Sequence, residues 1–221
     1  MELLHIPISP MLQAALCIIV ISDLGMLATE RLPQGIRLLT LQGTVLAILP
    51  LTGDIAPLSW HLIVMTLIFL ALKALVLPHL LRRTRANLPA SPPLPPYMGY
   101  NRCVLAGLMA FAFTLWIASR LPVPANPLFL VFFAPAVTTV IAGLLLIITR
   151  RKILTQVMGY LVLENGIYLL GVPLARHDAA WLELCILLDV SVGIFIMVVA
   201  IKHLNRAFDS IDVDSIASLK D

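Results

Sequence analysis

Residues 127–149 read PLFLVFFAPAVTTVIAGLLLIIT and contain no charged side chain. As a helix, this stretch is long enough to cross the hydrocarbon core of a bilayer, which takes about 20 apolar residues. The rest of the chain has the same character: of its 221 residues, 60% are hydrophobic and only 12% are charged, and the mean hydropathy is +1.00. Soluble domains are about 45–50% apolar and about 25% charged. The composition therefore predicts an integral membrane protein and excludes a disordered chain.

Hydropathy in windows of about 19 residues predicts seven membrane spans. They cover residues 8–29, 37–53, 58–80, 103–120, 127–149, 153–175 and 180–203. Apolar segments of this length cross a membrane as helices, because a helix satisfies all of its backbone hydrogen bonds within the segment. The expected fold is all-α, a polytopic membrane protein with about seven transmembrane helices.

The basic residues indicate the orientation of these spans. Twelve of the fifteen Lys and Arg fall on one side: Arg31, Arg37, Arg82, Arg83, Arg85, Arg102, Arg150, Arg151, Lys152, Lys202, Arg206 and Lys220. The other side receives Arg120 and Arg176, and Lys73 lies inside a span. Loops rich in Lys and Arg remain in the cytoplasm. We therefore expect the N-terminus outside and the C-terminus in the cytoplasm, which requires an odd number of spans.

A proline-rich run divides the chain. Residues 89–96 read PASPPLPP, which favours polyproline II and cannot continue a helix. The expected units are an N-terminal three-helix membrane unit (1–81), a Pro-rich cytoplasmic linker (82–102), a connecting transmembrane helix (103–126) and a three-helix unit with a cytoplasmic tail (127–221). A basic turn followed by a polar-Gly step occurs in both three-helix units, at Gln42-Gly43 and at Glu164-Asn165-Gly166. This weak echo leaves open a duplication into parallel repeats.

Several kinds of membrane chemistry lack their residues. Cys17, Cys103 and Cys185 are scattered, so neither a disulfide framework nor a zinc site is indicated. The five histidines lie at span ends or in loops, which disfavours a haem between helices. The last span carries Asp189 where a retinal protein has its Schiff-base lysine, and protease and esterase motifs are absent. The net charge of +3 is too small and too scattered to indicate nucleic acid.

Away from the span ends, four charged residues fall inside spans, namely Asp23, Lys73, Glu164 and Asp189. A charge near the centre of a bilayer costs at least about 2.5–3.5 kcal/mol, so such residues face the interior of the bundle, pair with each other or mark an ion path. We expect these four residues to form a proton relay. For Asp23 and Lys73 a structural role stays open, either by pairing or, for Lys73, by snorkelling to the interface.

Three polar neighbours are expected to support the relay. Tyr160 and Tyr168 lie four residues on either side of Glu164, and residues at this spacing share a helix face. Asn165 is adjacent to the carboxylate in sequence. Gly193 follows Asp189 by four residues and would let another helix approach that carboxylate.

From residue 150 onward, four features occur in a fixed order. They are the basic turn Arg150-Arg151-Lys152, the step Gly159 to Asn165 containing Glu164, the sequence Asp189-Val190-Ser191-Val192-Gly193 and the tail Asp212 to Lys220. This order resembles the K-type (NuoK) subunit of respiratory complex I. The whole chain resembles the component E (HyfE) family of hydrogenase-4-type complexes, which are membrane-bound [NiFe] hydrogenases related to formate hydrogenlyase. The Leu163–Gly166 step and the Leu219-Lys220 end carry that likeness, and residues 1–100 share only its layout.

The resemblance implies specific roles. Asp189 occupies the position of the second membrane glutamate of the K-type subunit, whereas Leu161 stands where the first glutamate belongs. Glu164 lies three residues later on the same helix, about 4.5 Å deeper at 1.5 Å per residue. The implied protein is a non-catalytic subunit of a redox-driven, proton-translocating oxidoreductase complex in a bacterial or archaeal cytoplasmic (inner) membrane. Its implied partners are antiporter-like membrane subunits and a hydrogenase arm, and the nickel–iron and iron–sulfur centres would belong to those partners, with no cofactor bound by this chain.

Two other functions stay open at this stage. An autonomous secondary transporter of ions or solutes is consistent with the repeat echo and with prolines inside or beside spans, at Pro50, Pro78, Pro135 and Pro173. A structural spacer subunit would have the same partners, but its activity would not depend on Glu164 and Asp189.

Overall fold

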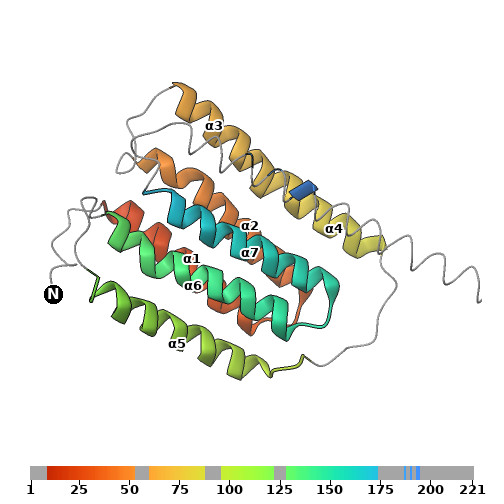
Figure 1. The fold of residues 1–221 in the computed structure, drawn as a ribbon. Coiled ribbons are helices and arrows are strands. Elements are labelled where there is room, and N and C mark those ends of the chain that lie inside the picture. The colour runs from red at the N-terminus through yellow and green to blue at the C-terminus, as the bar shows by residue number, and fades with distance from the viewer. Residues whose placement is uncertain are drawn as a thin grey trace, which may run out of the picture.

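The computed structural model describes residues 9–52, 60–87, 96–121 and 128–173, and in addition Leu187, Val190, Gly193 and Ile194. Every regular element in this part of the chain is a helix (Figure 1). The elements are α1 (Pro10–Ala28), α2 (Leu32–Ile48), a 3₁₀ turn η2 (Leu49–Thr52), α3 (Trp60–Leu70), a π-helical segment η3 (Ala71–Val76), α4 (Leu77–Asn87), α5 (Tyr100–Ala118), α6 (Leu128–Thr149) and α7 (Ile153–Gly171). Segments α3, η3 and α4 follow one another without interruption as a single rod.

Six helical stretches within the described residues are long and apolar enough to cross a membrane. They correspond to the first six predicted spans, and the all-α membrane class is confirmed. The seventh predicted span, 180–203, lies almost entirely outside the described residues, but its four described positions are all helical.

Local sequence explains where the helices begin and end. Ser9 caps α1 by accepting a hydrogen bond from the backbone N–H of Leu12 at 3.2 Å. Helix α2 begins at Leu32, earlier than predicted, because Pro33 in its first turn has the helical φ already fixed. Helix α4 continues to Asn87, beyond the predicted end at residue 80, since arginine favours helix and no breaker occurs before Pro89. The first residues assigned to the linker are therefore helical.

The helices form layers with two hairpins at the centre. Figure 1 shows the α3–η3–α4 rod on one side, then α2 with α7, then α1 with α6, and α5 on the far side. Helix α1 contacts α2, α5 and α6, whereas α2 contacts α7 and η3. Helices α1 and α6 run in one direction, and α2 and α7 run back (Figure 1). The hairpins α1–α2 and α6–α7 therefore lie side by side in parallel.

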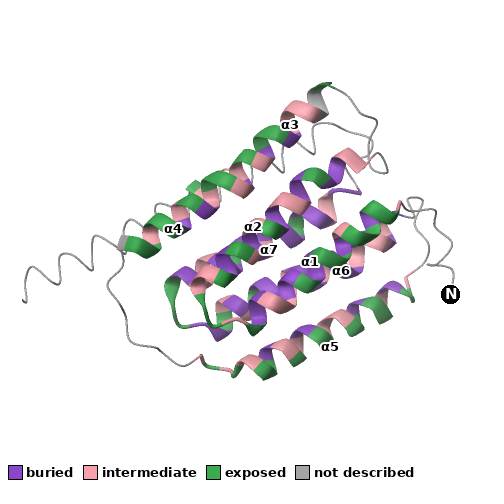
Figure 2. Cartoon of the chain, turned by 180° about the vertical axis from the view of Figure 1, so that it is seen from behind, coloured by how far each residue is buried: buried purple, intermediate pink, exposed green. Residues whose placement is uncertain are grey.

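Burial follows the same layers. Figure 2 shows buried residues concentrated on α1, α2, α6 and α7, whereas many residues of α5 and the outer rod are exposed. In α7, 56% of an 18-residue apolar stretch is buried inside the structure, compared with 22% of the corresponding stretch in α5. The exposed side chains of α5 include Met109 and Trp116, which are apolar. A helix that exposes apolar side chains in this way is suited to lipid or to a neighbouring membrane subunit.

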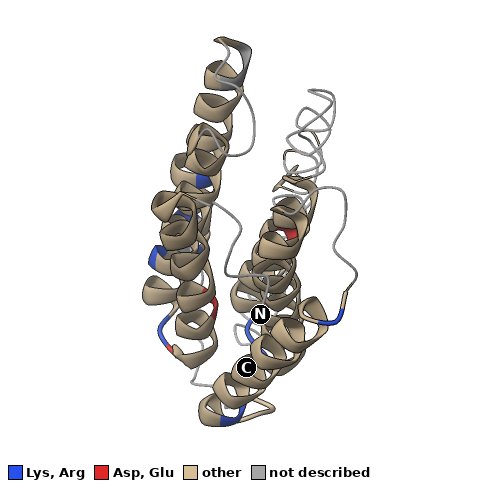
Figure 3. Cartoon of the chain, turned by 90° about the vertical axis from the view of Figure 1, so that its left-hand side faces the viewer, with Lys and Arg blue, Asp and Glu red and all other residues tan. Residues whose placement is uncertain are grey.

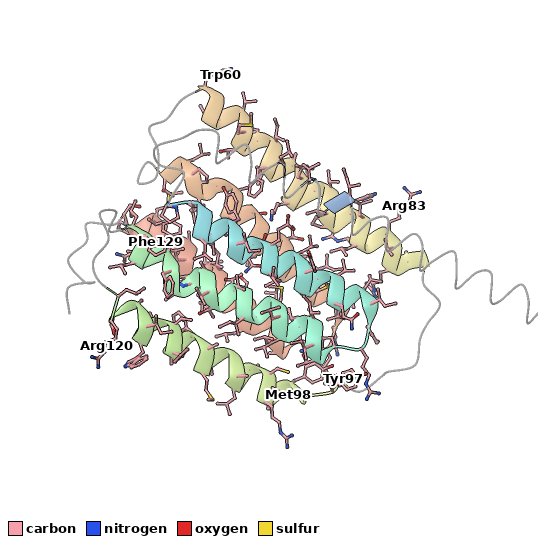
Figure 4. All side chains as sticks on the ribbon, viewed as in Figure 1. Trp60, Arg83, Tyr97, Met98, Arg120 and Phe129 are labelled. Atoms are coloured by element: carbon pink, nitrogen blue, oxygen red, sulfur yellow. The ribbon has the colours of Figure 1, made fainter. Side chains whose placement is uncertain are left out.

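Basic side chains join the ends of three helices. The buried Arg150 guanidinium donates from Nη2 to the carbonyl of Leu27 at 2.6 Å and lies over the Tyr100 ring at 4.1 Å. Arg151 lies over the Tyr97 ring at 4.2 Å. Figure 3 shows that most positions along the helices are uncharged residues. In Figure 4, Arg120 lies at the end opposite Tyr97 and Arg83. The basic loops therefore gather at one end of the bundle.

Helices α6 and α7 approach each other closely, and glycine permits this contact. A Cβ atom on Gly143 would lie 2.5 Å from the backbone nitrogen of Leu163 and 2.7 Å from the carbonyl oxygen of Gly159. Real Cβ atoms do not approach backbone so closely, so only glycine allows the two helices to meet here. Small residues have the same role wherever membrane helices pack closely.

Replacing Gly143 by leucine should therefore push α6 away from α7. Overpacking of this kind costs about 1–3 kcal/mol or more, and for a chain of this size each kcal/mol corresponds to roughly 2–4 °C in Tm. Thermal unfolding in detergent measures the shift. The control is Gly99→Ser, because serine is favoured at the N-cap of α5 and no atom lies within 4 Å of the added Cβ. An unchanged Tm for Gly143→Leu would contradict the packing described.

Candidate functional site

Polar side chains that belong to five different elements meet inside the bundle. They come from α1, α2, η3, α6 and α7, and they are Asp23, Gln42, Lys73, Thr139 and Asn165. None is more than 5% exposed. Two of the four predicted relay residues and one predicted supporting residue are therefore brought together in one site.

Asp23 forms one end of this site. It lies in α1 and is 1% exposed. Its Oδ1 accepts a hydrogen bond from Nε2 of Gln42 at 2.8 Å, and its Oδ2 accepts one from the hydroxyl of Thr139 at 2.7 Å. The Thr139 hydroxyl also lies 2.9 Å from the carbonyl oxygen of Pro135, one turn earlier in α6. Both carboxylate oxygens are thus held by neighbouring helices.

Lys73 forms the other end, and a proline shapes its helix. Pro78 has no N–H to donate and its ring clashes with the carbonyl four residues earlier. The helix widens there into the π-helical η3, in which the N–H of Leu77 bonds to the carbonyl of Leu72. Segments of this kind often occur at functional sites. Lys73 lies within η3 and is 5% exposed.

The Lys73 side chain points into the bundle. Its Nζ donates to Oδ1 of Asn165 at 2.5 Å and lies 5.1 Å from the centre of the Phe69 ring. Gly43 of α2 makes room for it, because a Cβ at that position would lie 3.0 Å from the Cβ of Lys73. Of the two roles left open by the sequence, the structure thus supports an interior position and not snorkelling.

Two amides connect the ends. Nδ2 of Asn165 donates to Oε1 of Gln42 at 3.1 Å, and Nε2 of Gln42 donates to Asp23. Gln42 is fully buried and Asn165 is 1% exposed. The continuous chain Lys73–Asn165–Gln42–Asp23, extended by Thr139, is called the polar chain below. It crosses the interface between the two hairpins.

Glu164 and its tyrosines occupy different positions on α7. Glu164 is 4% exposed, next in sequence to Asn165 of the polar chain. Tyr168 is buried and its ring stacks on Phe69 with centroids 4.7 Å apart. Tyr160 is 42% exposed, because it belongs with Ile167 to an outward stripe of α7. The expectation that both tyrosines share the face of Glu164 therefore holds for Tyr168 and is wrong for Tyr160.

Asp189 lies outside the described residues. Gly193, one helical turn after it, is described, and a Cβ on this glycine would lie 3.4 Å from Cδ2 of Leu77. The described part of the seventh predicted span thus approaches α4 at the residue that follows η3. The separation is an ordinary van der Waals distance, and the prediction that Gly193 lets a helix approach the Asp189 carboxylate stays a prediction.

A small cavity adjoins the link between Lys73 and Asn165. The space open to the centre of a water molecule is about 10 Å³, enough for about one water. Its lining consists of Leu39, Lys73, Leu77, Leu161 and Asn165. Leu161, the residue that stands where the family resemblance expects a glutamate, therefore faces the Lys73 end of the polar chain.

Sequence reasoning missed Gln42 and Thr139 as site residues. Gln42 stands out in the sequence only as part of the repeat echo, and Thr139 is one of two adjacent threonines in the middle of an apolar run. A fully buried glutamine in a membrane span is itself an indication, because an uncharged amide in lipid still needs partners. Within the described ranges, no three His, Cys, Asp or Glu residues gather as metal ligands would.

Comparison with known proteins identifies relatives that span most of the chain. The uncharacterized protein Rv0085 of Mycobacterium tuberculosis is 34% identical over 190 residues, which is 84% of this chain and 85% of the relative. Hydrogenase-4 component E of Escherichia coli and of Shigella flexneri is 25% identical over 148 residues, 67% of this chain and 68% of each relative. No family model and no solved structure matches the chain. The chain therefore belongs to one family with Rv0085, and it is similar to the hydrogenase-4 component E proteins that its sequence resembles.

Proposed function

We propose that this chain is a non-catalytic membrane subunit of a hydrogenase complex, and more specifically of a complex I-like assembly of the hydrogenase-4 or formate hydrogenlyase type. Its buried ionisable residues would contribute to proton translocation coupled to electron transfer. The relatives named hydrogenase-4 component E support the assembly. The observation that carries the role in translocation is the burial of Asp23, Lys73 and Glu164 inside an apolar bundle, where the polar chain connects the first two.

The physical argument is the cost of such groups in lipid. Ionisable residues at membrane depth are expensive and typically mark ion paths or proton relays. Asp23, Lys73 and Glu164 are each at most 5% exposed. Asp189 is included by its predicted position in the seventh span and by its resemblance to the second membrane glutamate of the K-type subunit.

The proposal assigns the redox centres to other subunits. This chain would bind no cofactor, and the nickel–iron and iron–sulfur centres would lie in the hydrogenase arm. Antiporter-like membrane subunits would pack against it, for which the exposed apolar sides of α5 and of the α3–η3–α4 rod offer surface. The membrane would be the cytoplasmic (inner) membrane of a bacterium or an archaeon.

Purification from the native host in mild detergent tests the assembly. We expect the affinity-tagged chain to bring hydrogenase and iron–sulfur subunits with it, because its exposed apolar faces would be covered in the complex. A monodisperse single chain that moves an ion or a solute across liposomes would instead establish the autonomous transporter.

Neutralising the membrane carboxylates tests the role in translocation. In the intact complex, Glu164→Gln and Asp189→Asn should each reduce the number of protons moved per electron to a small fraction of the wild-type ratio, while hydrogen or formate oxidation continues. Proton uptake by inverted membrane vesicles, measured beside electron transfer, gives that ratio. Glu30→Gln is the control, because Glu30 is an exposed acid between α1 and α2. Wild-type ratios in both variants would favour the structural spacer.

The orientation is tested at the two ends of the chain. With the N-terminus outside and the C-terminus in the cytoplasm, a fluorescent protein that folds only in the cytoplasm should fluoresce after Asp221. An epitope before Met1 should be labelled on intact spheroplasts. Both termini on the same side would mean an even number of spans and would overturn the seven-span topology.

A further inference from the structure

We infer that Gln42 and Asn165 are an oriented amide bridge, through which the charges at Lys73 and Asp23 act on each other without a proton passing between them. The two amides are then positioning residues. The inference concerns equilibrium coupling within this chain, and it rests on the proposed function only for the use that the assembly makes of the coupling.

The end groups fix the direction of the bridge. An ammonium group only donates hydrogen bonds, and an ionised carboxylate only accepts them. Lys73 must therefore meet the oxygen of Asn165, which turns the Asn165 amino group toward Gln42. Gln42 receives that group on its oxygen and presents its own amino group to Asp23. Only this arrangement satisfies all three links at once.

The same direction aligns the amide dipoles with the two charges. Each carbonyl oxygen faces the lysine side of the bridge, and each amino group faces the aspartate side. Both charges are stabilised by the nearer amide, and each amide polarises the next. In a dry interior such interactions are stronger than in water, and hydrogen-bond chains reinforce one another. If either end group loses its charge, the orientation of both amides is no longer stabilised.

Amides do not relay protons as water or carboxyl groups do. The amide nitrogen is a donor without a lone pair that accepts, and the carbonyl oxygen has no proton to pass on. A proton at Lys73 therefore does not pass along the polar chain to Asp23. The cavity at that link, which has room for about one water, is where exchange at the lysine end would occur. The bridge therefore transmits the electrostatic effect of the Lys73 charge to Asp23 and does not transmit a proton.

A double-mutant cycle on the full chain tests the bridge. The variants are Asp23→Asn, Lys73→Met and the double variant, and the readout is Tm in detergent. Each single variant should lower Tm, because it removes one of the two buried charges with which the amide dipoles are aligned. The double variant should lose at least about 2–4 °C less in Tm than the sum of the two single losses. In a chain of this size, interaction between two coupled residues shifts Tm by this amount.

The cycle is then repeated in backgrounds that cut the bridge. Gln42→Met removes one amide at similar volume, and Asn165→Leu removes the other, so the test survives if one background fails to fold. In either background the non-additivity should disappear. Thr138→Val is the matched control, since it removes a buried hydroxyl that bonds Ala134 and Thr114 outside the polar chain. In this control background the coupling should persist.

Two results would overturn the bridge. One is additivity of Asp23→Asn and Lys73→Met in the wild-type background. The other is coupling of unchanged size after Gln42→Met or Asn165→Leu, which would mean that the two charges interact by another route and that the amides serve packing alone. Because the cycle is read from Tm, its failure is separate from a failure of the proposed role in translocation, which is read from protons moved per electron.

Discussion

An apolar bundle has no water to satisfy a polar side chain, so each buried polar group must find its partner on a neighbouring helix. The polar chain meets this requirement across five elements, and its links cross from α2 to α7, from α7 to η3 and from α1 to α6. Each link fixes the rotation of two helices about their axes, because a turned helix would leave an amide or a charge unsatisfied at a cost of several kcal/mol. The polar chain thus sets the register between the two hairpins.

Glycine and basic side chains determine the rest of the arrangement. The close contact at Gly143 brings α7 against α6, and this position lets Asn165 reach α2 on the other side. At the basic end, the Arg150 guanidinium ties α6 to the last turn of α1 and to the first turn of α5. Packing and polar contacts therefore support each other, as they do in proteins that adopt one well-defined structure.

The class of protein and most of its spans could be predicted from composition and hydropathy, because in lipid only a helix satisfies its own backbone. The sequence also indicated Asp23, Lys73 and Asn165, since charge or polarity stands out in an apolar run. It could not indicate that Gln42 and Thr139 join them, because those contacts depend on how helices far apart in sequence are rotated. The outward position of Tyr160 escaped prediction for a similar reason: residues four apart are offset by about 40°, and at the edge of a buried face this offset decides exposure.

The prolines illustrate how local chemistry and site depend on each other. Proline in a membrane span is often a sign of a broken helix that binds a transported ion. Here α6 continues through Pro135, and α3 continues into α4 because η3 absorbs the constraint of Pro78. Both prolines lie within five residues of an end of the polar chain, Pro135 near Thr139 and Pro78 near Lys73. Both prolines therefore lie where side chains of the polar chain enter the bundle. In these two helices the geometry therefore favours coupling between fixed groups over a site that carries a solute.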